Sequence, residues 1–284
     1  YGYNAGALSL TNLVSSTGVV ATDVTGVGTA RLNLAAVGYG TGLAMFGYGV
    51  NASAFNYSMT NLVSNTGVVA TDVTGVGTAR AHLAAAAFGS TGQAIFGYGY
   101  TGSYVSMTNL VNSVGTVATD VTGVGTARYG LAATGFGSSG QVIFACGLDA
   151  TNYDSITNIV SSAGVVATDT AGIATARYSL AAATFGSSGQ AIMAYGSGLT
   201  TYLSLSNLIS SAGVVATDTT GVGTARYGLA AAAFGTSGQA IFGYGFTGSY
   251  VSMTNIVSNS GVVATDVTGV GTGRRFPAAA GFGS

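Results

Sequence analysis

The stretch T-G-V-G-T-A-R-Y-G-L-A-A-A-A-F-G, residues Thr220–Gly235, is the most informative segment of the chain because near-copies of it recur six times along the 284 residues. Its arginine marks each repeat, and successive copies are spaced by 48 or 49 residues. A repeat of this length is a supersecondary unit that buries its apolar faces only against neighbouring copies. The six marker residues are Arg31, Arg80, Arg128, Arg177, Arg226 and Arg274.

Two other polar residues keep a strict register with these arginines. An aspartate stands eight residues before each arginine, and an asparagine stands in a [T/S]-N-[L/I]-[V/I] phrase of each repeat. The aspartates are Asp23, Asp72, Asp120, Asp169, Asp218 and Asp266. The asparagines are Asn12, Asn61, Asn109, Asn158, Asn207 and Asn255.

One repeat contains four segments that are typical of short β-strands: Leu131–Phe136, Gln141–Cys146, Ser155–Val160 and Val165–Thr170. They are β-branched, aromatic or small, and turns of Gly, Ser and Asn bound them, which favours antiparallel meanders. No window carries a helical period of 3.6 residues, and glycine recurs too often for helix. The repeat therefore predicts an all-β chain without helices.

Four short strands in each of six repeats predict a six-bladed β-propeller of four-stranded antiparallel blades, formed by residues 1–284 as a single domain. The first strand of each repeat is nearly all alanine and glycine, as in Ala84–Ala87. Small residues suit the crowded strands nearest the axis of a propeller, where neighbouring blades converge.

The two ends of the chain belong to one repeat. Tyr1–Tyr3 aligns with Tyr98–Tyr100 late in a second strand, and Phe282–Ser284 aligns with Phe185–Ser187 just after a first strand. We therefore expect strands from both termini to close the ring. About seven residues equivalent to Ser188–Ala194 are not represented, which suggests that a longer natural chain is trimmed or that part of it is unseen.

The composition argues against several partners. Charged residues make up 5% of the chain, lysine and glutamate do not occur, and the net charge is −1. Such a chain has no long-range field to attract nucleic acid or an anionic membrane. Although 48% of the residues are hydrophobic, no apolar run approaches the roughly 18–20 residues of a membrane helix. We expect neither nucleic-acid binding nor membrane insertion.

The phrase R-Y-G-L-A-A-A-A-F-G-T-S-G-Q-A-I-F-G-Y-G (Arg226–Gly245) resembles the kelch repeat, and the resemblance covers all six repeats. It departs from the kelch pattern in that the double glycine becomes Gly-Tyr-Gly and tryptophan is absent. The sequence looks still more like kelch-like repeat proteins of tailed bacteriophages. That resemblance implies a virion-associated tail or appendage role and no catalytic residues.

The chain offers little for catalysis or for a cofactor. His82 is the single histidine, so the ligands of a kelch-type copper oxidase are not available, and a working acid–base pair would have to use His82 or an aspartate. We therefore predict no enzyme activity and no cofactor. Asp149 and Asp154 suit a calcium ion, but two carboxylates in one loop are more often simply solvated. We expect Cys146, which stands where other repeats have tyrosine, to be buried and inert.

The marker arginines are the first candidate binding residues. They occupy the link before each first strand, and we expect them to point toward one rim of the central channel. A carboxylate, sulfate or phosphate would then bind there. The alternative is structural: each arginine pairs with the aspartate of its own repeat or bonds carbonyls of the glycine-rich link.

The loops between second and third strands are the second set of candidates, on the same face as the arginine links. They vary against the constant repeat and combine aromatic with amide and hydroxyl groups, which suits recognition. The alternative is that the rings cap the apolar ends of the blades. The residues chosen are Tyr57, Tyr100, Tyr104, Tyr153, Tyr202 and Tyr250, with Tyr3, Phe55 and Phe246 beside them.

Two functions follow from these features. The first is a non-enzymatic structural propeller of a virion or an extracellular assembly, with other structural proteins or copies of itself as partners. The reason is that its fourth strands are outer edges of low charge, on which other chains could pack. The second is a receptor- or carbohydrate-binding propeller that holds a cell-surface glycan with the aromatic loops and the arginine face.

Overall fold

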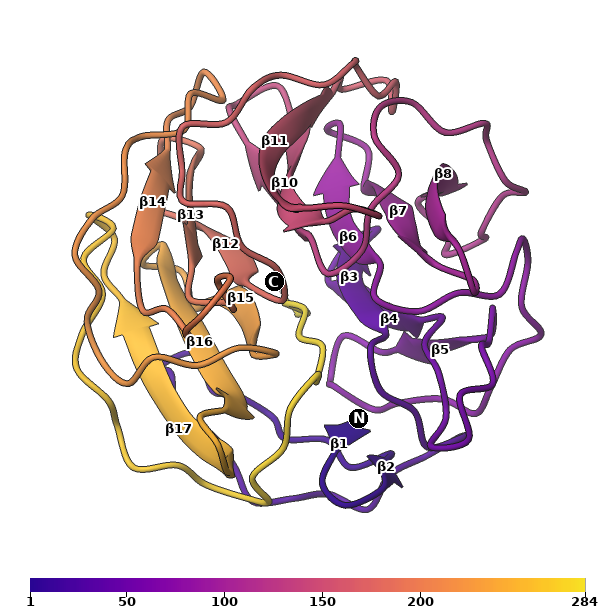
Figure 1. Cartoon of the computed structure of the whole chain (residues 1–284). Helices are drawn as coiled ribbons and strands as arrows, with labels where there is room; N and C mark the ends of the chain where they lie inside the picture. The colour runs from indigo at the N-terminus through magenta and orange to yellow at the C-terminus, as the bar shows by residue number, and fades with distance from the viewer. Residues whose placement is uncertain (284) are drawn as a thin grey trace.

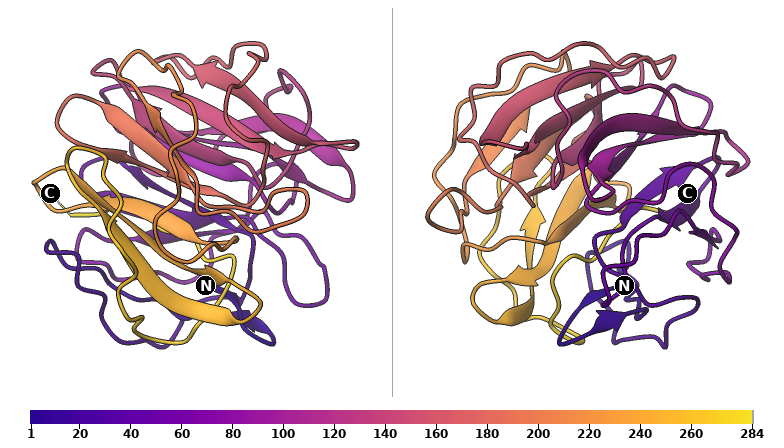
Figure 2. Two further views of the ribbon diagram at one scale, coloured as in Figure 1. Left: turned by 60° about the vertical axis from the view of Figure 1, so that its left-hand side comes forward. Right: turned by 45° about the vertical axis from the view of Figure 1, so that its right-hand side comes forward.

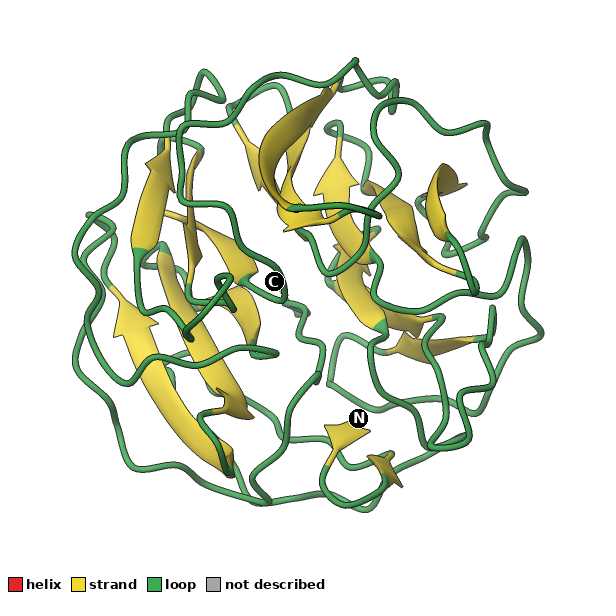
Figure 3. Ribbon diagram, viewed as in Figure 1, coloured by secondary structure: helices red, strands yellow, loops and turns green. Residues whose placement is uncertain are grey.

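The structure is a computed structural model that describes residues 1–283. These residues form six antiparallel sheets, five of three strands and one of two, joined by turns and loops (Figure 3). The prediction of an all-β chain built from six repeated antiparallel units is confirmed. Residues 1–283 contain no helix that could cross a membrane. The predicted domain ends at Ser284, which lies outside the described residues.

Each complete sheet is a meander whose first strand lies innermost and whose third lies outermost (Figure 1). The first strands are β3 (Ala35–Tyr39), β6 (Ala84–Phe88), β9 (Ala132–Phe136), β12 (Ala181–Phe185) and β15 (Ala230–Phe234). The second strands are β4 (Leu43–Gly47), β7 (Gln93–Tyr100), β10 (Gln141–Leu148), β13 (Gln190–Ala194) and β16 (Gln239–Phe246). The third strands are β5 (Thr60–Val63), β8 (Tyr104–Val111), β11 (Tyr153–Val160), β14 (Ser206–Ile209) and β17 (Tyr250–Val257).

The sheets follow one another around a common centre, and the two turned views show them lying face to face in sequence order (Figures 1 and 2). Successive first strands contact each other, from β3 to β6, β9, β12 and β15. These strands can approach closely because their side chains are small: a Cβ placed on Gly135 would lie 3.5 Å from the carbonyl oxygen of Ala87 in the neighbouring sheet.

The hydrophobic core lies between neighbouring sheets. One cluster joins Phe88 and Ile95 of the β6–β7 hairpin to Val142 and Phe144 of the β9–β10 hairpin, all fully or almost fully buried. Phe144 fills the space above Gly97, where a Cβ would lie 2.7 Å from its ring. Each sheet therefore buries its apolar face against the next one, which is the physical reason for the repeat.

The prediction that each blade contains a regular fourth strand is wrong. Its predicted range Val165–Thr170 makes only two isolated bridges to β11, Thr157↔Thr170 and Val160↔Val166. The bridges enclose one more residue on the outer segment than on β11, and this bulge interrupts the ladder. The side-chain amide of Asn158 compensates by donating to the carbonyl of Ala167 at 3.0 Å.

The sixth sheet contains only β1 (Gly2–Tyr3) and β2 (Ala7–Leu8). The C-terminal segment Ala278–Phe282, expected as a first strand, does not form one among the described residues, because no second strand lies beside it. It nevertheless runs to the centre of the molecule (Figure 1). There it lies between β15 and β3: a Cβ on Gly281 would be 3.4 Å from Ala233 O, and a Cβ on Gly38 would be 3.1 Å from Gly281 O.

Two series of backbone hydrogen bonds connect successive units near the centre. In the first, the backbone N of the residue two positions after a marker arginine donates to the carbonyl of its counterpart in the preceding unit, from His82 onward, and these residues, like Asn33, have a positive φ of 53–64°. This series runs through Asn33, His82, Gly130, Ser179, Gly228 and Phe276. In the second, turn glycines at the other ends of the first strands are joined, as in Gly40 N–Gly92 O and Gly283 N–Gly42 O, both 2.8 Å.

Candidate functional site

The marker arginines lie between sheets and are enclosed. Five are 0% exposed and Arg274 is 3% exposed. Arg128 donates from Nη2 to Asn158 Oδ1 at 2.7 Å, from Nη1 to Thr126 O at 3.1 Å and from Nε to Cys146 O at 2.8 Å. The prediction that these side chains point toward the rim of the central channel is wrong, because protein groups surround each guanidinium.

The acidic partner of each arginine comes from the following repeat. Arg128 Nη1 lies 3.9 Å from Asp169 Oδ1, and Asp169 also accepts hydrogen bonds from Thr126 N, Thr126 Oγ1 and Asn158 Nδ2. The prediction of a pair within one repeat is wrong, whereas the predicted bond to a link carbonyl is confirmed. Arg128 lies in the link just before the first strand of a sheet, and Asp169 lies in the outer segment that follows the third strand of the same sheet. The ion pair therefore joins the two ends of that sheet.

Burial alone would raise the pKa of the Asp169 carboxyl. The hydrogen bonds from Thr126 and Asn158 and the charge of Arg128 outweigh that effect and hold the pKa below its ordinary value of 3.8. The other five repeat aspartates have lowered pKa values for the same reasons. We call each set of arginine, threonine, asparagine and aspartate an arginine cluster.

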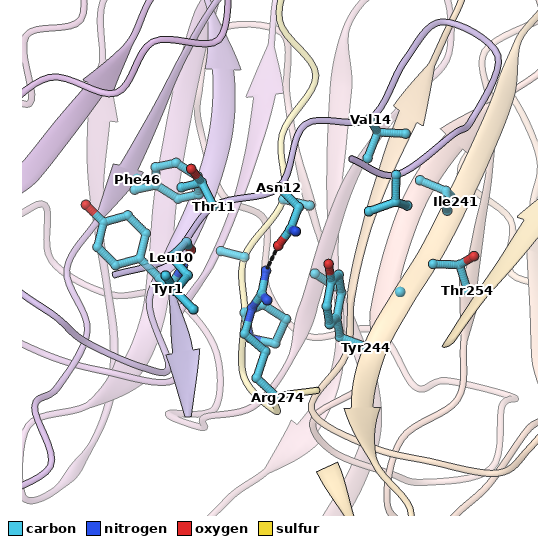
Figure 4. A pocket seen from close by; sticks show the side chains of 16 residues that line it. Tyr1, Leu10, Thr11, Asn12, Val14, Phe46, Ile241, Tyr244, Thr254 and Arg274 are labelled. Atoms are coloured by element: carbon cyan, nitrogen blue, oxygen red, sulfur yellow. Dashed lines mark hydrogen bonds between the residues drawn. The ribbon is translucent and has the colours of Figure 1, made fainter. Parts of the chain in front are cut away.

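The sixth arginine cluster joins the two ends of the chain. Arg274 donates to Asn12 Oδ1 (Figure 4). Thr272 donates to Asp23 from both its backbone N and its Oγ1. Arg274 also lies 3.6 Å from Asp23 Oδ1. The C-terminal link therefore meets the N-terminal outer segment in the same way as the link and the outer segment of every other unit.

A tyrosine of the preceding sheet lies beneath most of these arginines. The guanidinium of Arg128 is 4.4 Å from the ring centre of Tyr98, and Tyr98 donates its hydroxyl to Val124 O at 3.1 Å. Tyr98 has a φ of 62° at a register shift in β7, which turns its side chain between the sheets. The cation–π contact and the hydroxyl bond explain why a buried position keeps a polar ring.

Cys146 occupies this position beneath Arg177, and the prediction that it is buried is confirmed. Burial raises the pKa of its thiol to about 11, so the thiol stays protonated at neutral pH. The same unit differs from the others at a second position, because Ala174 stands where Gly125 stands in the preceding repeat. Ala174 packs in one hydrophobic cluster with Cys146. Loss of the large ring and gain of a methyl group occur together.

Aromatic residues gather at the end of the first strands where the marker arginines enter. Five rings contact one another in a closed circuit with centroid distances of 4.9–6.3 Å. They belong to His82, Tyr129, Tyr178, Tyr227 and Phe276. Burial and the neighbouring tyrosines raise the pKa of Tyr178 to about 12. Burial and the charge of Arg275 lower the pKa of His82 to about 4, so both groups are neutral at pH 7.

The structure brings five of the six predicted loop tyrosines to this circuit. Tyr104 stacks on Tyr129 with 5.5 Å between centroids and 20° between planes. The ring contacts that complete the group are Tyr100–Tyr104, Tyr153–Tyr178, Tyr202–Tyr227, Tyr250–Phe246 and Tyr3–Tyr250. We call the circuit and these rings the aromatic face. Tyr57 lies apart, packed on Phe55 and bonded to Asn51.

Arg275 is a member of the aromatic face that the sequence-based prediction did not include. Its guanidinium lies 5.1–5.9 Å from the ring centres of Tyr3, Phe246, Tyr250 and Phe276 and donates to the Tyr227 hydroxyl at 2.7 Å. Within residues 1–283 it forms no salt bridge, unlike the six marker arginines. The doubled arginine Arg274–Arg275 was the signal that could have identified it.

The aromatic face is filled on one side and hollow on the other. Tyrosine follows the marker arginine in three consecutive units, but Leu32 and Ala81 take that position in the first two. A groove of about 490 Å³ opens there, which we call the face groove. Its lining includes Tyr3, Leu32, Asn51, Asn56, Ala81, His82 and Tyr100. Aromatic faces beside amide groups suit a ligand with both apolar and hydroxyl surfaces.

The two acidic residues outside the repeat lie in the loop after β10. Asp149 Oδ1 accepts hydrogen bonds from Thr151 N, Thr151 Oγ1 and Asn152 N. Burial and the charge of Asp149 raise the pKa of Asp154. In the part of the chain that the structure describes, no group of three or more His, Cys, Asp or Glu side chains is placed to hold a metal ion.

No family model matches the chain, and no curated protein sequence is significantly similar to it. The resemblance to kelch repeats and to phage proteins therefore remains a prediction from the quoted residues. The structure itself establishes an all-β repeat protein with enclosed arginine clusters and one aromatic face.

Proposed function

We propose that the chain is a closed six-bladed propeller of kelch-like type, and that it serves without catalysis as a structural component of a virion tail or appendage, or of an extracellular assembly. Closure is supported by three contacts of the C-terminal segment: Arg274 with Asn12, Gly283 with Gly42, and the antiparallel backbone bridge Tyr3↔Arg275. Each contact has a counterpart elsewhere in the chain: Arg128 with Asn158, Gly186 with Gly238, and the bridge Ala81↔Tyr100.

The observation that carries the structural role is the outer perimeter. The first valine of the outer segment is 64–66% exposed in five of the six units: Val19, Val68, Val165, Val214 and Val262. A second valine follows the aspartate in four units and is about half exposed, at Val24, Val73, Val121 and Val267. A regularly repeated apolar perimeter with very little charge suits packing against other protein.

Light scattering after size-exclusion chromatography, over a concentration series, tests this role. We expect the chain to self-associate, or to bind particles of its own assembly, and the variant Val68→Glu/Val165→Glu to do so much less. Thr116→Glu is the matched control, because that unit has threonine at the valine position. A chain that stays monomeric at all concentrations and binds no particle would contradict the proposal.

The face groove favours a second function, binding of a cell-surface glycan. Sugars present apolar ring faces and hydroxyl edges, which match Tyr100 with Asn51 and Asn56 at this groove. A glycan array should show binding that the variant Tyr100→Ala/Tyr104→Ala loses. Phe55→Ala is the control, since Phe55 is exposed but packs on Tyr57 away from the aromatic face. Unchanged binding by the double variant would exclude the groove.

A further inference from the structure

Arg275 is the only arginine of residues 1–283 that has no acidic partner. Each of the six marker arginines forms a salt bridge to a repeat aspartate. The two remaining aspartates, Asp149 and Asp154, stand in the loop after β10 and in β11, and neither forms a salt bridge with Arg275 among these residues. The charge of the Arg275 side chain is therefore not compensated within the described part of the chain.

The position of Arg275 places this charge beside the face groove. The residue after a marker arginine bridges to the end of a second strand, as Ala81 does to Tyr100, and Arg275 makes the same bridge to Tyr3. Ala81, Tyr100 and Tyr3 all line the face groove. Arg275 therefore occupies, next to the groove, a place that tyrosine takes in three other units.

Two ring contacts connect Arg275 to the wall of the face groove. The centre of the Tyr3 ring is 5.3 Å from the Arg275 guanidinium. His82 lines the groove as well, and its ring is 5.7 Å from that of Phe276, the residue after Arg275. Burial and, after it, the charge of Arg275 lower the pKa of His82. A ligand in the face groove would therefore lie in the field of this charge.

The Arg275 guanidinium is held in place, but its donors are not exhausted. Nη1 donates to the Tyr227 hydroxyl at 2.7 Å, and four aromatic rings surround the group at 5.1–5.9 Å. Within residues 1–283, Nη2 makes no hydrogen bond, and the side chain is partly exposed. Parallel N–H groups of a guanidinium match the two oxygens of a carboxylate. Rings that fix the guanidinium also reduce the entropy lost on binding.

The other groups of the face groove favour a sugar as the carrier of that carboxylate. Tyr100 contributes an aromatic ring, and the Asn56 amide and the Thr101 hydroxyl line the same groove. These groups match the apolar face and the hydroxyl edge of a sugar ring. With a net charge of −1, the chain has no broad positive field to attract a dense polyanion. A single cation beside such a groove suits a ligand of dispersed negative charge.

We propose that the glycan bound at the face groove is acidic, with the carboxylate of a uronic or sialic acid residue on the Arg275 guanidinium and a neighbouring sugar ring in the groove. The inference rests on the glycan binding proposed above and names its chemical class. The carboxylate supplies the partner that Arg275 lacks within residues 1–283. A charge-assisted hydrogen bond is roughly twice as strong as a neutral one, so the carboxylate should bind more tightly than a hydroxyl in its place.

Matched pairs of glycans test the carboxylate directly. An array would carry acidic oligosaccharides, such as tetragalacturonate and sialyllactose, each beside the same oligosaccharide with its carboxylates reduced to alcohols. We expect the acidic member of a pair to bind about tenfold or more tightly. Raising the salt concentration should weaken binding of the acidic member only, because ions screen a partly exposed charge pair.

Two variants assign the effect to Arg275. Arg275→Gln should bind both members of a pair equally, at about the affinity of the reduced member. Arg275→Lys is the matched control, because it keeps the charge without the planar pair of donors and should retain a smaller preference. Circular dichroism checks that both variants are folded, and the salt series on the unaltered chain tests the charge without any substitution.

The outcomes separate this inference from glycan binding itself. Equal binding of both members by the unaltered chain, or a preference that Arg275→Gln keeps, would overturn the inference and leave glycan binding at the face groove standing. No binding to any glycan would contradict the glycan function as well. Binding of polyaspartate in place of every glycan would overturn both in favour of an acidic protein segment.

Discussion

Arg274 and Arg275 are adjacent in the sequence and lie in opposite environments. Arg274 is enclosed between sheets, bonded to Asn12 and paired with Asp23. Arg275 lies among four aromatic rings of the aromatic face and has the Tyr227 hydroxyl as its side-chain partner. The first belongs to a set repeated six times, and the second occurs once. Repeated polar residues here hold the units together, whereas the residues that vary between repeats form the aromatic face.

The largest expected difference between the two environments is in stability. Arg128→Met leaves Asn158 Oδ1 and Thr126 O without their donor and Asp169 without its cation. We expect the free energy of unfolding to fall by about 3–5 kcal/mol, the usual cost of breaking a buried ion pair. Chemical denaturation followed by circular dichroism measures it.

The matched control is Arg275→Met. Since this side chain makes one hydrogen bond, contacts to aromatic rings and no ion pair among the described residues, its loss should cost about 1–2 kcal/mol. Similar losses for the two variants would remove the distinction between a structural and a surface arginine.

The second-largest effect on stability is expected from acid, which protonates the aspartates of the arginine clusters. The repeat aspartates have a lower pKa in the folded chain than their ordinary 3.8, so the stability they contribute is complete above that pH and is lost as the pH falls below it. Melting temperatures from pH 7 to pH 2 should therefore drop steeply at the acid end, and Asp169→Asn should reduce the slope.

The contribution of Asp154 to stability should depend on pH in the opposite direction. Its folded pKa is raised by burial and by Asp149, so its ionisation weakens the fold as the pH rises above 3.8. Asp154→Asn should raise the melting temperature at pH 7 and leave the acid slope unchanged. A lower melting temperature for Asp154→Asn at pH 7 would show that its carboxylate has a stabilising partner.

A smaller effect is expected where one unit departs from the others. Cys146→Tyr combined with Ala174→Gly should restore the ring beneath Arg177 and stabilise the fold by about 1 kcal/mol, the usual range of a cation–π contact. Cys146→Tyr alone should stabilise less, or destabilise, because the methyl group of Ala174 occupies space beside the ring. Thermal denaturation of both variants checks this. Equal stabilities would mean that the two departures are independent.

The smallest stability change is expected on the aromatic face. Tyr153→Ala removes an edge contact with Tyr178 from a partly buried position, so the loss should stay near or below about 1 kcal/mol. Ligand binding is the property expected to change there. A loss as large as that of Arg128→Met would mean that the aromatic face is part of the core.

The sequence predicted the repeat, its all-β character and three of its four strands, because those depend on local alternation and on turn residues. The expected segments Leu131–Phe136, Gln141–Cys146 and Ser155–Val160 correspond to β9, β10 and β11 within two residues at each end. The fourth segment failed because a bulge, with Asn158 bonded across it, cannot be recognised from alternation alone. The loop tyrosines were found by their variation between repeats, and Arg275 was overlooked because it adjoins a repeated arginine.

The amino-acid sequence by itself determined that six similar units must pack against one another, because a single unit cannot bury the apolar faces of its own sheet. Only the tertiary structure decided which aspartate meets which arginine, which rings form the aromatic face, and where the face groove opens. These depend on contacts between residues about 40 or more positions apart or at opposite ends of the chain. A repeating sequence presents every copy as equivalent, and packing in three dimensions is what distinguishes them.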